Sequence, residues 1–388
     1  MSNVFLIGLV SFFADMSTEM VYPLIPLYLT SVFGATPALV GVIEGIAESL
    51  AALLKVFSGY FSDKYQKKKP LAFLGYASGL VYKILLIFAT SWVGILVGRV
   101  TDRFGKGIRT APRDVLVSES SDANRLGFSF GLHKMLDMAG SAVGILIAFF
   151  IFTAWKGDYD FQNLFLLSCI PAVLSLLMFA FIKETKKIRV VNAPPLHVFQ
   201  GLKTLDSRLK LYLIVVFLFT LGNSSNAFLI LRASDEGFDT ASVILLYFLY
   251  NVVSSALALP MGKVSDQIGR KKVLVMGYFI FAVVYAAFAW ADSKSMIVSA
   301  FVLYGFFTAM TAGVERAFIA EIAPKELKGT MLGLHSTIVG VALLPASIIA
   351  GFLWNGFGAA VPFAVGASLS LLAAVILGFG LSSRRINS

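Results

Sequence analysis

Long apolar stretches alternate with short polar segments along the whole chain. About twenty apolar residues are enough for a helix to cross a hydrocarbon core of about 30 Å. Such stretches occur near residues 4–29, 38–60, 70–89, 93–116, 128–152, 162–182, 211–233, 239–262, 273–291, 296–320, 330–354 and 359–381. Lipid offers no hydrogen bonds to backbone amides, so helices are the expected form. The pattern predicts an all-α membrane protein with about twelve transmembrane helices.

Lysine and arginine are concentrated in every second gap between these stretches. The clusters include Lys64 to Lys69, the segment 183–210 and Lys263 to Lys272. By the positive-inside rule, these gaps and both chain ends face the cytoplasm. The segment 183–210, which contains Pro194 and Pro195, predicts a cytoplasmic linker between a bundle at 1–182 and a second bundle at 211–388.

The two predicted bundles repeat each other. Gly59, Asp63 and Lys67 correspond to Gly262, Asp266 and Arg270, each 203 positions later. Glu119, Gly127, Gly131 and His133 correspond to Glu321, Gly329, Gly333 and His335, each 202 positions later. A nearly constant offset in two separate places predicts a six-helix unit duplicated in tandem.

Composition supports lipid as the main solvent of the chain. Of 388 residues, 58% are hydrophobic and 14% are charged, with a mean hydropathy of +0.83. The net charge of +10 lies in the loops rather than on one face of a soluble domain, so no nucleic-acid partner is expected. We expect a monomer in the inner membrane of the cell, because pairs such as Gly75 and Gly79 suit close helix packing within one bundle.

The common enzymatic and metal-binding motifs give no support for an enzyme. The single cysteine, Cys169, excludes an intrachain disulfide, and HExxH, CxxC and nucleotide-binding loop patterns are absent from the sequence. The string from Gly127 to Gly131 reads G-x-S-x-G, but it opens a predicted membrane helix instead of a strand-to-helix turn. We therefore expect no catalytic residue, no metal and no cofactor.

Many ionisable residues lie at membrane depth in the first bundle, where each would be costly if it faced lipid. We expect them to face one another or water. The carboxylates predicted to couple transport to protons are Asp15, Glu19, Glu48 and Asp137. The alternative is that these acids only neutralise nearby bases in fixed ion pairs. His133 and His335 suit a packing role better than a pH-responsive one.

Further residues are predicted to contact a solute or to pair with its charges. In the first bundle these are Tyr22, Arg99, Asp102 and Arg103. In the second bundle they are Asn223, Asn226, Tyr247, Tyr250, Asn251, Tyr304, Glu315 and Arg316. Neutral hydrogen-bonding groups among aromatic rings suit an amphipathic organic solute. Polar contacts that only hold helices together are the alternative.

Three segments resemble motifs of the major facilitator superfamily. GYFSDKYQKKK (59–69) and GKVSDQIGRKK (262–272) are similar to its loop signature, and RFGKGIRTA (103–111) is similar to the fourth-helix motif of its proton-linked drug exporters. Ile145 stands where those exporters are expected to have proline. The resemblance covers the whole chain and implies two six-helix bundles that transport a small solute by alternating access.

The loop signature also implies a cytoplasmic gate. We expect Asp63 to bind the start of the helix near Gly329 and to pair with Arg113, and Asp266 to lie near Gly127. The residues assigned to gating are Gly59, Asp63, Lys67, Arg113, Gly262, Asp266 and Arg270.

Three functions follow from these observations. Export of a small organic solute by proton antiport is favoured by the motif around Arg103. Proton-coupled uptake on the same scaffold is the second. A non-transporting membrane sensor or a lipid scramblase is the third, and it is disfavoured because a sensor has no need of two matching gates.

Overall fold

The computed structural model describes residues 3–65, 68–120, 126–154, 160–183, 207–322 and 328–380, and their secondary structure is helical. The first group comprises α1 (Asn3–Val21), η1 (Tyr22–Leu24), α2 (Ile25–Phe33), α3 (Pro37–Tyr65), α4 (Lys68–Ile87), α5 (Trp92–Glu119), α6 (Leu126–Ala154) and α7 (Asp160–Ala180). The second comprises α9 (Ser207–Gly222), α10 (Ala227–Asp235), α11 (Thr240–Ile268), α12 (Arg270–Ala289), α13 (Lys294–Thr311), α14 (Val314–Ile322), α15 (Lys328–Phe357) and α16 (Ala360–Gly380). We refer to these groups as the N-terminal half and the C-terminal half.

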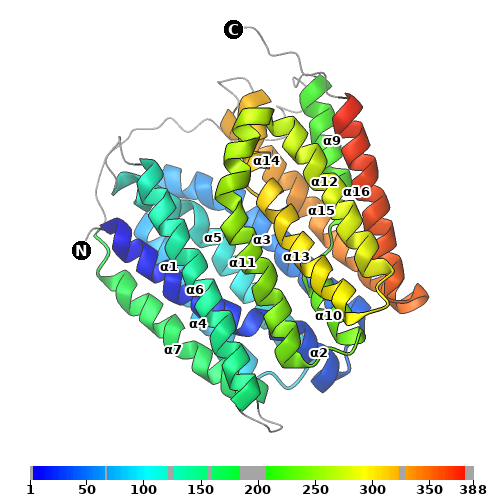
Figure 1. Ribbon diagram of the computed structural model, residues 1–388. Helices are drawn as coiled ribbons and strands as arrows, with labels where there is room; N and C mark the ends of the chain where they lie inside the picture. The colour runs from blue at the N-terminus through cyan, green and yellow to red at the C-terminus, as the bar shows by residue number, and fades with distance from the viewer. Residues whose placement is uncertain are drawn as a thin grey trace.

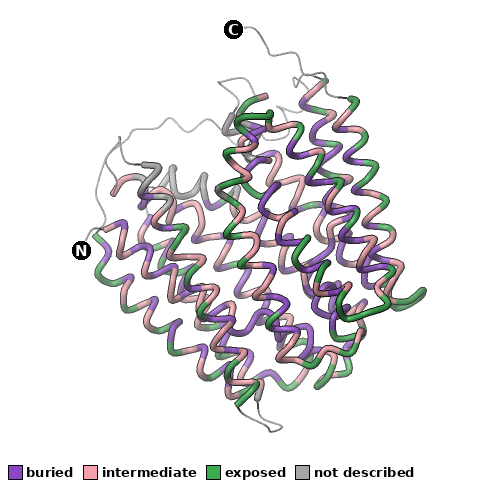
Figure 2. The backbone as a smooth tube through the Cα atoms, viewed as in Figure 1, coloured by how far each residue is buried: buried purple, intermediate pink, exposed green. Residues whose placement is uncertain are grey.

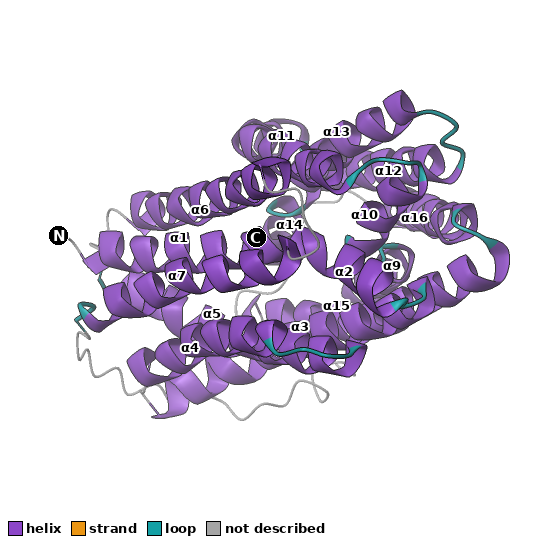
Figure 3. Ribbon diagram, turned by 90° about the horizontal axis from the view of Figure 1, so that it is seen from below, coloured by secondary structure: helices purple, strands orange, loops and turns teal. Residues whose placement is uncertain are grey.

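The two halves lie side by side as bundles of roughly aligned helices (Figures 1 and 3). They meet mainly where α3 packs on α15 and where α6 packs on α11. Smaller contacts join α10 to α2 and α3. The all-α fold in two six-span bundles is as the sequence predicts; the borders at 182 and 210 stay predictions, and residues 184–206 lie outside the described part.

Eleven helical segments among the described residues are long and apolar enough to cross a membrane. One of them is Asn3–Phe33, in which α1, η1 and α2 follow one another, with Pro23 and Pro26 at the breaks. α5 has the length of a span, at 28 residues, but carries a row of charged side chains. Adding α5 to the eleven gives the twelve spans that the hydrophobic pattern predicts.

Two of the predicted spans are interrupted helices. The stretch 211–233 begins earlier, at Ser207, and is interrupted between Gly222 and Ala227. There the Ser225 hydroxyl accepts a hydrogen bond from the Ala227 amide at 3.3 Å, an alternative to the helical backbone bond that serine often supplies. The stretch 296–320 is interrupted between Thr311 and Val314, at Gly313, a residue with low helix propensity.

Large apolar side chains are exposed in every part of the described surface, as the lipid-facing prediction requires. Examples are Phe88 at 76% exposure, Phe150 at 62% and Phe379 at 90%. Charged side chains of α5 are instead buried, such as Arg99 at 0% and Asp102 at 5%. Figure 2 shows buried, intermediate and exposed positions alternating along the helices. The apolar-out, polar-in arrangement is that of a protein whose solvent is lipid.

Glycines let helices approach closely at two important places. A Cβ added at Gly41 of α3 would lie 2.2 Å from the Ser347 carbonyl oxygen of α15, across the two halves. A Cβ at Gly140 of α6 would lie 2.1 Å from the Phe12 carbonyl oxygen of α1, within one half. Larger residues at either position would force the helices apart, and such small-residue contacts are typical of membrane bundles.

Candidate functional site

A network of buried ion pairs joins α3 to α5. Arg99 donates two hydrogen bonds to Glu44, at 2.7 Å from Nε and 2.6 Å from Nη2, and both side chains are at most 1% exposed. Arg99 Nη1 also lies 3.6 Å from Asp102 Oδ2. The spacing of Arg99 and Asp102 by three residues puts both on one face of α5. A parallel two-bond geometry is the strongest form of an arginine–carboxylate pair.

One helical turn further, Arg103 repeats the arrangement with Glu48. Its Nη2 atom lies 2.8 Å from Glu48 Oε1. The Tyr22 ring of η1 lies against both guanidinium groups, with its centroid 5.1 Å from Arg99 Cζ and 5.4 Å from Arg103 Cζ. Flat guanidinium groups over an aromatic face gain cation–π attraction. Tyr22 of η1 and the α5 residues Arg99, Asp102 and Arg103 therefore form one cluster.

The pairing of these groups limits what they can do for a solute. The two strongest contacts of Arg99 are to Glu44, which was not among the predicted site residues. Removing one member of such a buried pair would cost about 3–5 kcal/mol, because the other charge would be left unpaired. The fixed-ion-pair alternative requires pairs of this kind, and the solute-binding role of Arg99 and the proton-coupling role of Glu48 stay predictions.

A second polar cluster lies between α1, α5 and α6. Asp15 and Asp137 face each other within hydrogen-bonding range. Arg109 Nη2 lies 3.6 Å from Asp15, and Lys134 Nζ lies 2.7 Å from Asp137. Two carboxylates this close repel each other when both are charged, and one shared proton removes that repulsion. Asp15 and Asp137 are thus brought together, although the sequence placed them on different spans.

The third predicted cluster lies in the C-terminal half and is mainly aromatic. Tyr304 donates a hydrogen bond to Asn226 Oδ1 at 2.7 Å, and Asn226 Nδ2 donates to the Tyr250 hydroxyl at 3.3 Å. The rings of Tyr247 and Tyr250 lie 5.0 Å apart, and those of Tyr250 and Tyr304 lie 5.4 Å apart. Helical spacing and the break before α10 bring these residues together. We call Asn226, Tyr247, Tyr250 and Tyr304 the tyrosine cluster.

One hydrogen bond links the tyrosine cluster to the predicted proton-coupling acids. The Tyr247 hydroxyl donates to Glu19 Oε2 at 3.3 Å, across the two halves. The ring of Tyr247 also lies 5.6 Å from the ring of Tyr22. Glu19 is therefore the predicted acid that lies directly against the predicted aromatic surface.

Other predicted solute contacts lie outside this cluster. Asn251 donates to the Tyr247 carbonyl of its own helix at 2.9 Å, which is a helix-internal contact. Asn223 lies in the break before α10 and, among the described residues, makes no side-chain hydrogen bond. Glu315 contacts Tyr278 and His335 instead, and the side chain of Arg316 lies outside the described ones.

Several residues that the sequence did not single out hold the site together. Ser225 bridges the halves: its hydroxyl donates to Glu44 Oε2 at 3.4 Å, and its backbone amide donates to Ser347 Oγ at 3.3 Å. Lys83, at 1% exposure, donates to Thr18 Oγ1 at 3.2 Å. Lys83 is one of the ionisable residues that the sequence places at membrane depth, and Arg109 could have been suspected for the same reason. Nothing in the sequence distinguishes Ser225 from other serines.

In the C-terminal half, the predicted gate residues Asp266 and Arg270 form an ion-pair chain with Glu321. Arg270 donates to Asp266 Oδ1 at 3.0 Å and to Glu321 Oε2 at 2.9 Å. Lys67 lies outside the described residues, and only the helical backbone is described for Gly59, Asp63 and Gly127, so the predicted contacts of Asp63 and Asp266 across the halves stay predictions. Arg113 binds Asp114 at 3.0 Å and lies 4.0 Å from Asp137. Gly262 is a described residue of α11.

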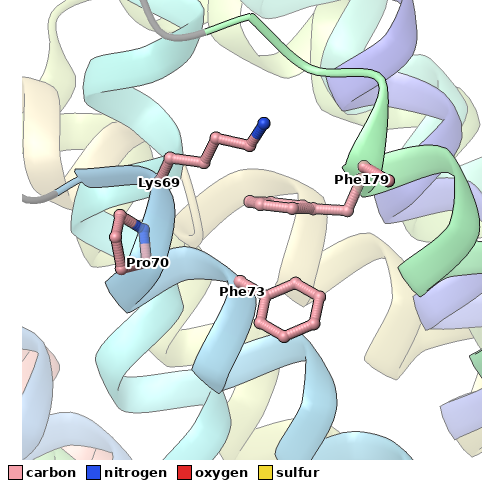
Figure 4. A pocket seen from close by; sticks show the side chains of 5 residues that line it. Lys69, Pro70, Phe73 and Phe179 are labelled. Carbon is pink, nitrogen blue, oxygen red and sulfur yellow. The ribbon is translucent and has the colours of Figure 1, made fainter.

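A pocket of about 380 Å³ lies away from these clusters, at the ends of α4 and α7. Figure 4 shows its lining by Lys69, Pro70, Phe73 and Phe179. The lining is mainly apolar, and Lys69 Nζ donates to the Ile182 carbonyl at 2.5 Å. None of the predicted site residues lines it, so it gives no support to a solute site there.

The model of the Major Facilitator Superfamily matches residues 7–247 and 212–386, which together cover nearly the whole chain. The chain belongs to the major facilitator superfamily. An uncharacterized transporter of this superfamily from Methanocaldococcus jannaschii is 37% identical over 383 residues, covering 97% of this chain and 94% of the relative. This multi-pass membrane protein is therefore a secondary transporter of a small molecule.

More distant superfamily members agree with the fold and leave the solute open. The multidrug resistance protein MdtH of Photorhabdus laumondii is 25% identical over 142 residues, 37% of this chain and 34% of that protein. The crystal structure of the nucleoside transporter NupG superposes with a TM-score of 0.80 at 11% identity, covering 97% of this chain and 98% of that one. At such identity the likeness shows the fold alone.

Proposed function

We propose that this superfamily member exports a small amphipathic organic solute in exchange for protons, as a monomer in the cytoplasmic membrane. Solute would bind at the tyrosine cluster of the C-terminal half. Protons would bind at Asp15, Glu19 and Asp137 of the N-terminal half. Alternating access would come from rocking of the two halves about the close contact of α3 with α15.

The hydrogen bond from Tyr247 to Glu19 carries this proposal. It is 3.3 Å long and joins a carboxylate of one half to the aromatic surface of the other. A solute bound against Tyr247 would contact Glu19 or displace this bond. Solute and proton would therefore act on the same carboxylate, so that each can influence the binding of the other.

The sign of the coupling follows from the chemistry of Glu19. A bound solute would donate hydrogen bonds to the charged carboxylate of Glu19. Protonation of Glu19 removes that charge and weakens these hydrogen bonds. Hydrogen bonds to a charged group contribute about 1.5–3 kcal/mol, roughly twice those of neutral pairs. Proton and solute would then disfavour each other's binding, and this mutual exclusion produces exchange.

The acids Asp15 and Asp137 support a proton route in the same half. They face each other within hydrogen-bonding range, and Arg109 lies 3.6 Å from Asp15. A proton shared by the two carboxyls can be released when Arg109, which lies 3.6 Å from Asp15, moves closer. Glu48 remains a proposed member of the set, although Arg103 holds it at 2.8 Å.

Proteoliposomes with a pH-sensitive dye inside test the proposal, because the two directions of coupling change luminal pH oppositely. Compounds from a panel of amphipathic organic molecules are added outside. Exchange makes the lumen more alkaline as solute enters and protons leave, whichever way the protein is inserted. Glu19→Gln is expected to lower this flux at least tenfold, while Tyr247→Phe, which removes only the hydroxyl, is expected to lower it less.

Proton-coupled uptake is the second candidate, supported by the distinct location of the Asp15–Asp137 pair. A proton bound at that pair would not compete with a solute at Tyr247, so both could move together. In the same experiment uptake would acidify the lumen on solute addition. That result would replace exchange by uptake; a complete lack of solute-dependent flux across the panel would contradict both.

A further inference from the structure

A second acidic site lies in the C-terminal half, apart from the tyrosine cluster. Glu315 of α14 accepts a hydrogen bond on Oε1 from the Tyr278 hydroxyl of α12, at 3.1 Å. Its Oε2 atom lies 3.8 Å from His335 Nε2 of α15. The two side chains are only 21% and 11% exposed. A carboxylate and an imidazole thus face each other in a largely buried setting.

Aromatic rings enclose this pair. The Tyr212 ring of α9 lies parallel to that of His335, with centroids 6.5 Å apart, and contacts Phe318 at 5.1 Å. The ring of Tyr278 stacks on Phe219 at 3.9 Å. Among the described side chains, the titratable groups facing the pair are Tyr212 and Tyr278. Arg316 follows Glu315 in the chain, and its side chain lies outside the described ones.

The N-terminal half has the same tyrosine and histidine but the opposite charge. Tyr76 and His133 stand 202 positions before Tyr278 and His335, and Arg113 stands 202 positions before Glu315. There His133 Nε2 lies 2.8 Å from the Ser11 hydroxyl, which lies 3.0 Å from the Tyr76 hydroxyl. A carboxylate stabilises an imidazolium, whereas a guanidinium opposes it. The two copies of this position therefore differ: a carboxylate faces the histidine of the C-terminal half, whereas a serine hydroxyl contacts the histidine of the N-terminal half.

We infer that Glu315 and His335 form a second proton-binding site, in the C-terminal half, with Tyr278 fixing the carboxylate. The inference rests on the proposed coupling to protons and adds a site in the half where only solute contacts were proposed. The step is a simple protonation: water on the cytoplasmic side delivers a proton to the imidazole, and the resulting N–H donates to Glu315 Oε2. As this N–H bond forms, an O–H bond of the donating hydronium ion breaks and a water molecule remains.

The position of Glu315 links such a site to the gate. Glu315 lies in the first turn of α14 and Glu321 in its last turn, and Glu321 binds Arg270, which also binds Asp266. Gly313 separates α14 from α13. Charge-assisted N–H···O bonds are about 2.7–2.9 Å long, so protonation would shorten the 3.8 Å contact between His335 and Glu315. Movement of α14 toward α15 would then act on Arg270.

Histidine titration followed by nitrogen NMR tests the site without any solute. The full chain, with its 3 histidines labelled, is placed in nanodiscs and titrated from pH 5 to 8. The His335 signal is assigned by its loss in His335→Gln. We expect His335 to titrate in this range, and its midpoint to move by about one pH unit or more in Glu315→Gln, because the opposite charge is lost.

His133→Gln is the matched control from the other half and should leave the titration of His335 unchanged. If Glu315→Gln does not fold, Tyr278→Phe replaces it, since loss of the hydroxyl removes the hydrogen bond that fixes the carboxylate beside His335. The inference is overturned if His335 does not titrate between pH 5 and 8, or if neither variant moves its midpoint. Failure of the proposed function would appear separately, as absent solute-dependent proton flux with the titration of His335 intact.

Thiol labelling tests the link to the gate. In a Cys169→Ser background, Ile268→Cys places a reporter at the end of α11, where Ile268 is 42% exposed. For each protein, the labelling rate at pH 5.5 is divided by the rate at pH 7.5. This ratio should differ at least threefold between the reporter protein and the same protein that also carries His335→Gln. Equal ratios in the two proteins would contradict the action of this site on the gate.

Discussion

The two halves place different chemistry at equivalent positions. α3 and α11 are both 29 residues long and start 203 positions apart, and there Glu44 and Glu48 correspond to Tyr247 and Asn251. α5 and α13 start 202 positions apart, and there Arg99 and Asp102 correspond to Phe301 and Tyr304. The ion-pair network of one half thus occupies the positions of the tyrosine cluster in the other.

This difference suggests how the two copies of a duplicated unit can take different parts in transport. Six helices fix the same geometry twice, so a change of side chains alone can give one half charges and the other half aromatic surfaces. Charged groups can hold or release protons, while rings offer apolar faces to an organic solute. The bond between Glu19 and Tyr247 then joins the two chemistries at the interface.

The largest expected effect comes from breaking the ion-pair network. Arg99→Met leaves Glu44 buried without its partner and should lower the free energy of unfolding by about 3–5 kcal/mol. Phe301→Leu, at the equivalent position of the C-terminal half, should cost only about 1 kcal/mol. Thermal unfolding in detergent, followed by tryptophan fluorescence, compares the two. Recovery of stability in Arg99→Met with Glu44→Gln is expected, and a double variant no better than the single one would argue against the pair.

The next largest effect tests the assignment of proton coupling to acids of the N-terminal half. Asp15→Asn together with Glu19→Gln should remove the pH dependence of transport between pH 5.5 and 8 and lower the proton flux at least tenfold. The reason is that both variants keep size and polarity but cannot take up a proton. Solute flux in proteoliposomes across this pH range measures it. Retained pH dependence in this protein would exclude both acids from proton coupling.

A smaller effect is expected in the tyrosine cluster. Tyr304→Phe removes the 2.7 Å hydrogen bond to Asn226 and should raise the half-saturating solute concentration about fivefold, equivalent to about 1 kcal/mol. Tyr82→Phe is the matched control, because the buried Tyr82 hydroxyl has no hydrogen-bond partner among the described residues. Solute titration of transport rates compares them. Equal effects of the two variants would show that the cluster does not bind solute.

The smallest effect is a difference in stability between two ion pairs that occupy equivalent positions in the two halves. Lys68 pairs with Glu119 where the side chains are 7% and 17% exposed, and Arg270 pairs with Glu321 where they are 31% and 51% exposed. Arg270→Gln should change stability by about 0–1 kcal/mol, and Lys68→Gln by about 2 kcal/mol. Thermal unfolding measures both. A larger loss in Arg270→Gln than in Lys68→Gln would contradict the ranking by burial.

Much of the fold could be predicted because hydrophobic length and charge position are strong local signals. The twelve spans follow from stretches of about twenty apolar residues, and the duplication follows from pairs such as Asp63 and Asp266. The breaks before Ala227 and Val314 were missed, because no proline marks them and serine or glycine within an apolar stretch is ordinary in membrane helices.

The residue types of the candidate site could be named from the sequence, whereas their pairings could not. Helical spacing places Arg99, Asp102 and Arg103 on one face, but it does not say which helix lies opposite. The partner of Arg99 proved to be Glu44, and the cross-half contact of Ser225 has no sequence signal at all. The Glu315–His335 pair was likewise hidden, since its members lie on different helices and become neighbours only through packing.

Proton release on solute binding tests the central claim most directly. Purified protein in nanodiscs and weak buffer is mixed with the solute found in the compound panel, and a pH indicator records the protons released. The account predicts release by the wild type, the same release by Tyr304→Phe at higher solute concentration, and a reduced release by Glu19→Gln. Proton uptake on binding, or an equal release by Glu19→Gln, would contradict it.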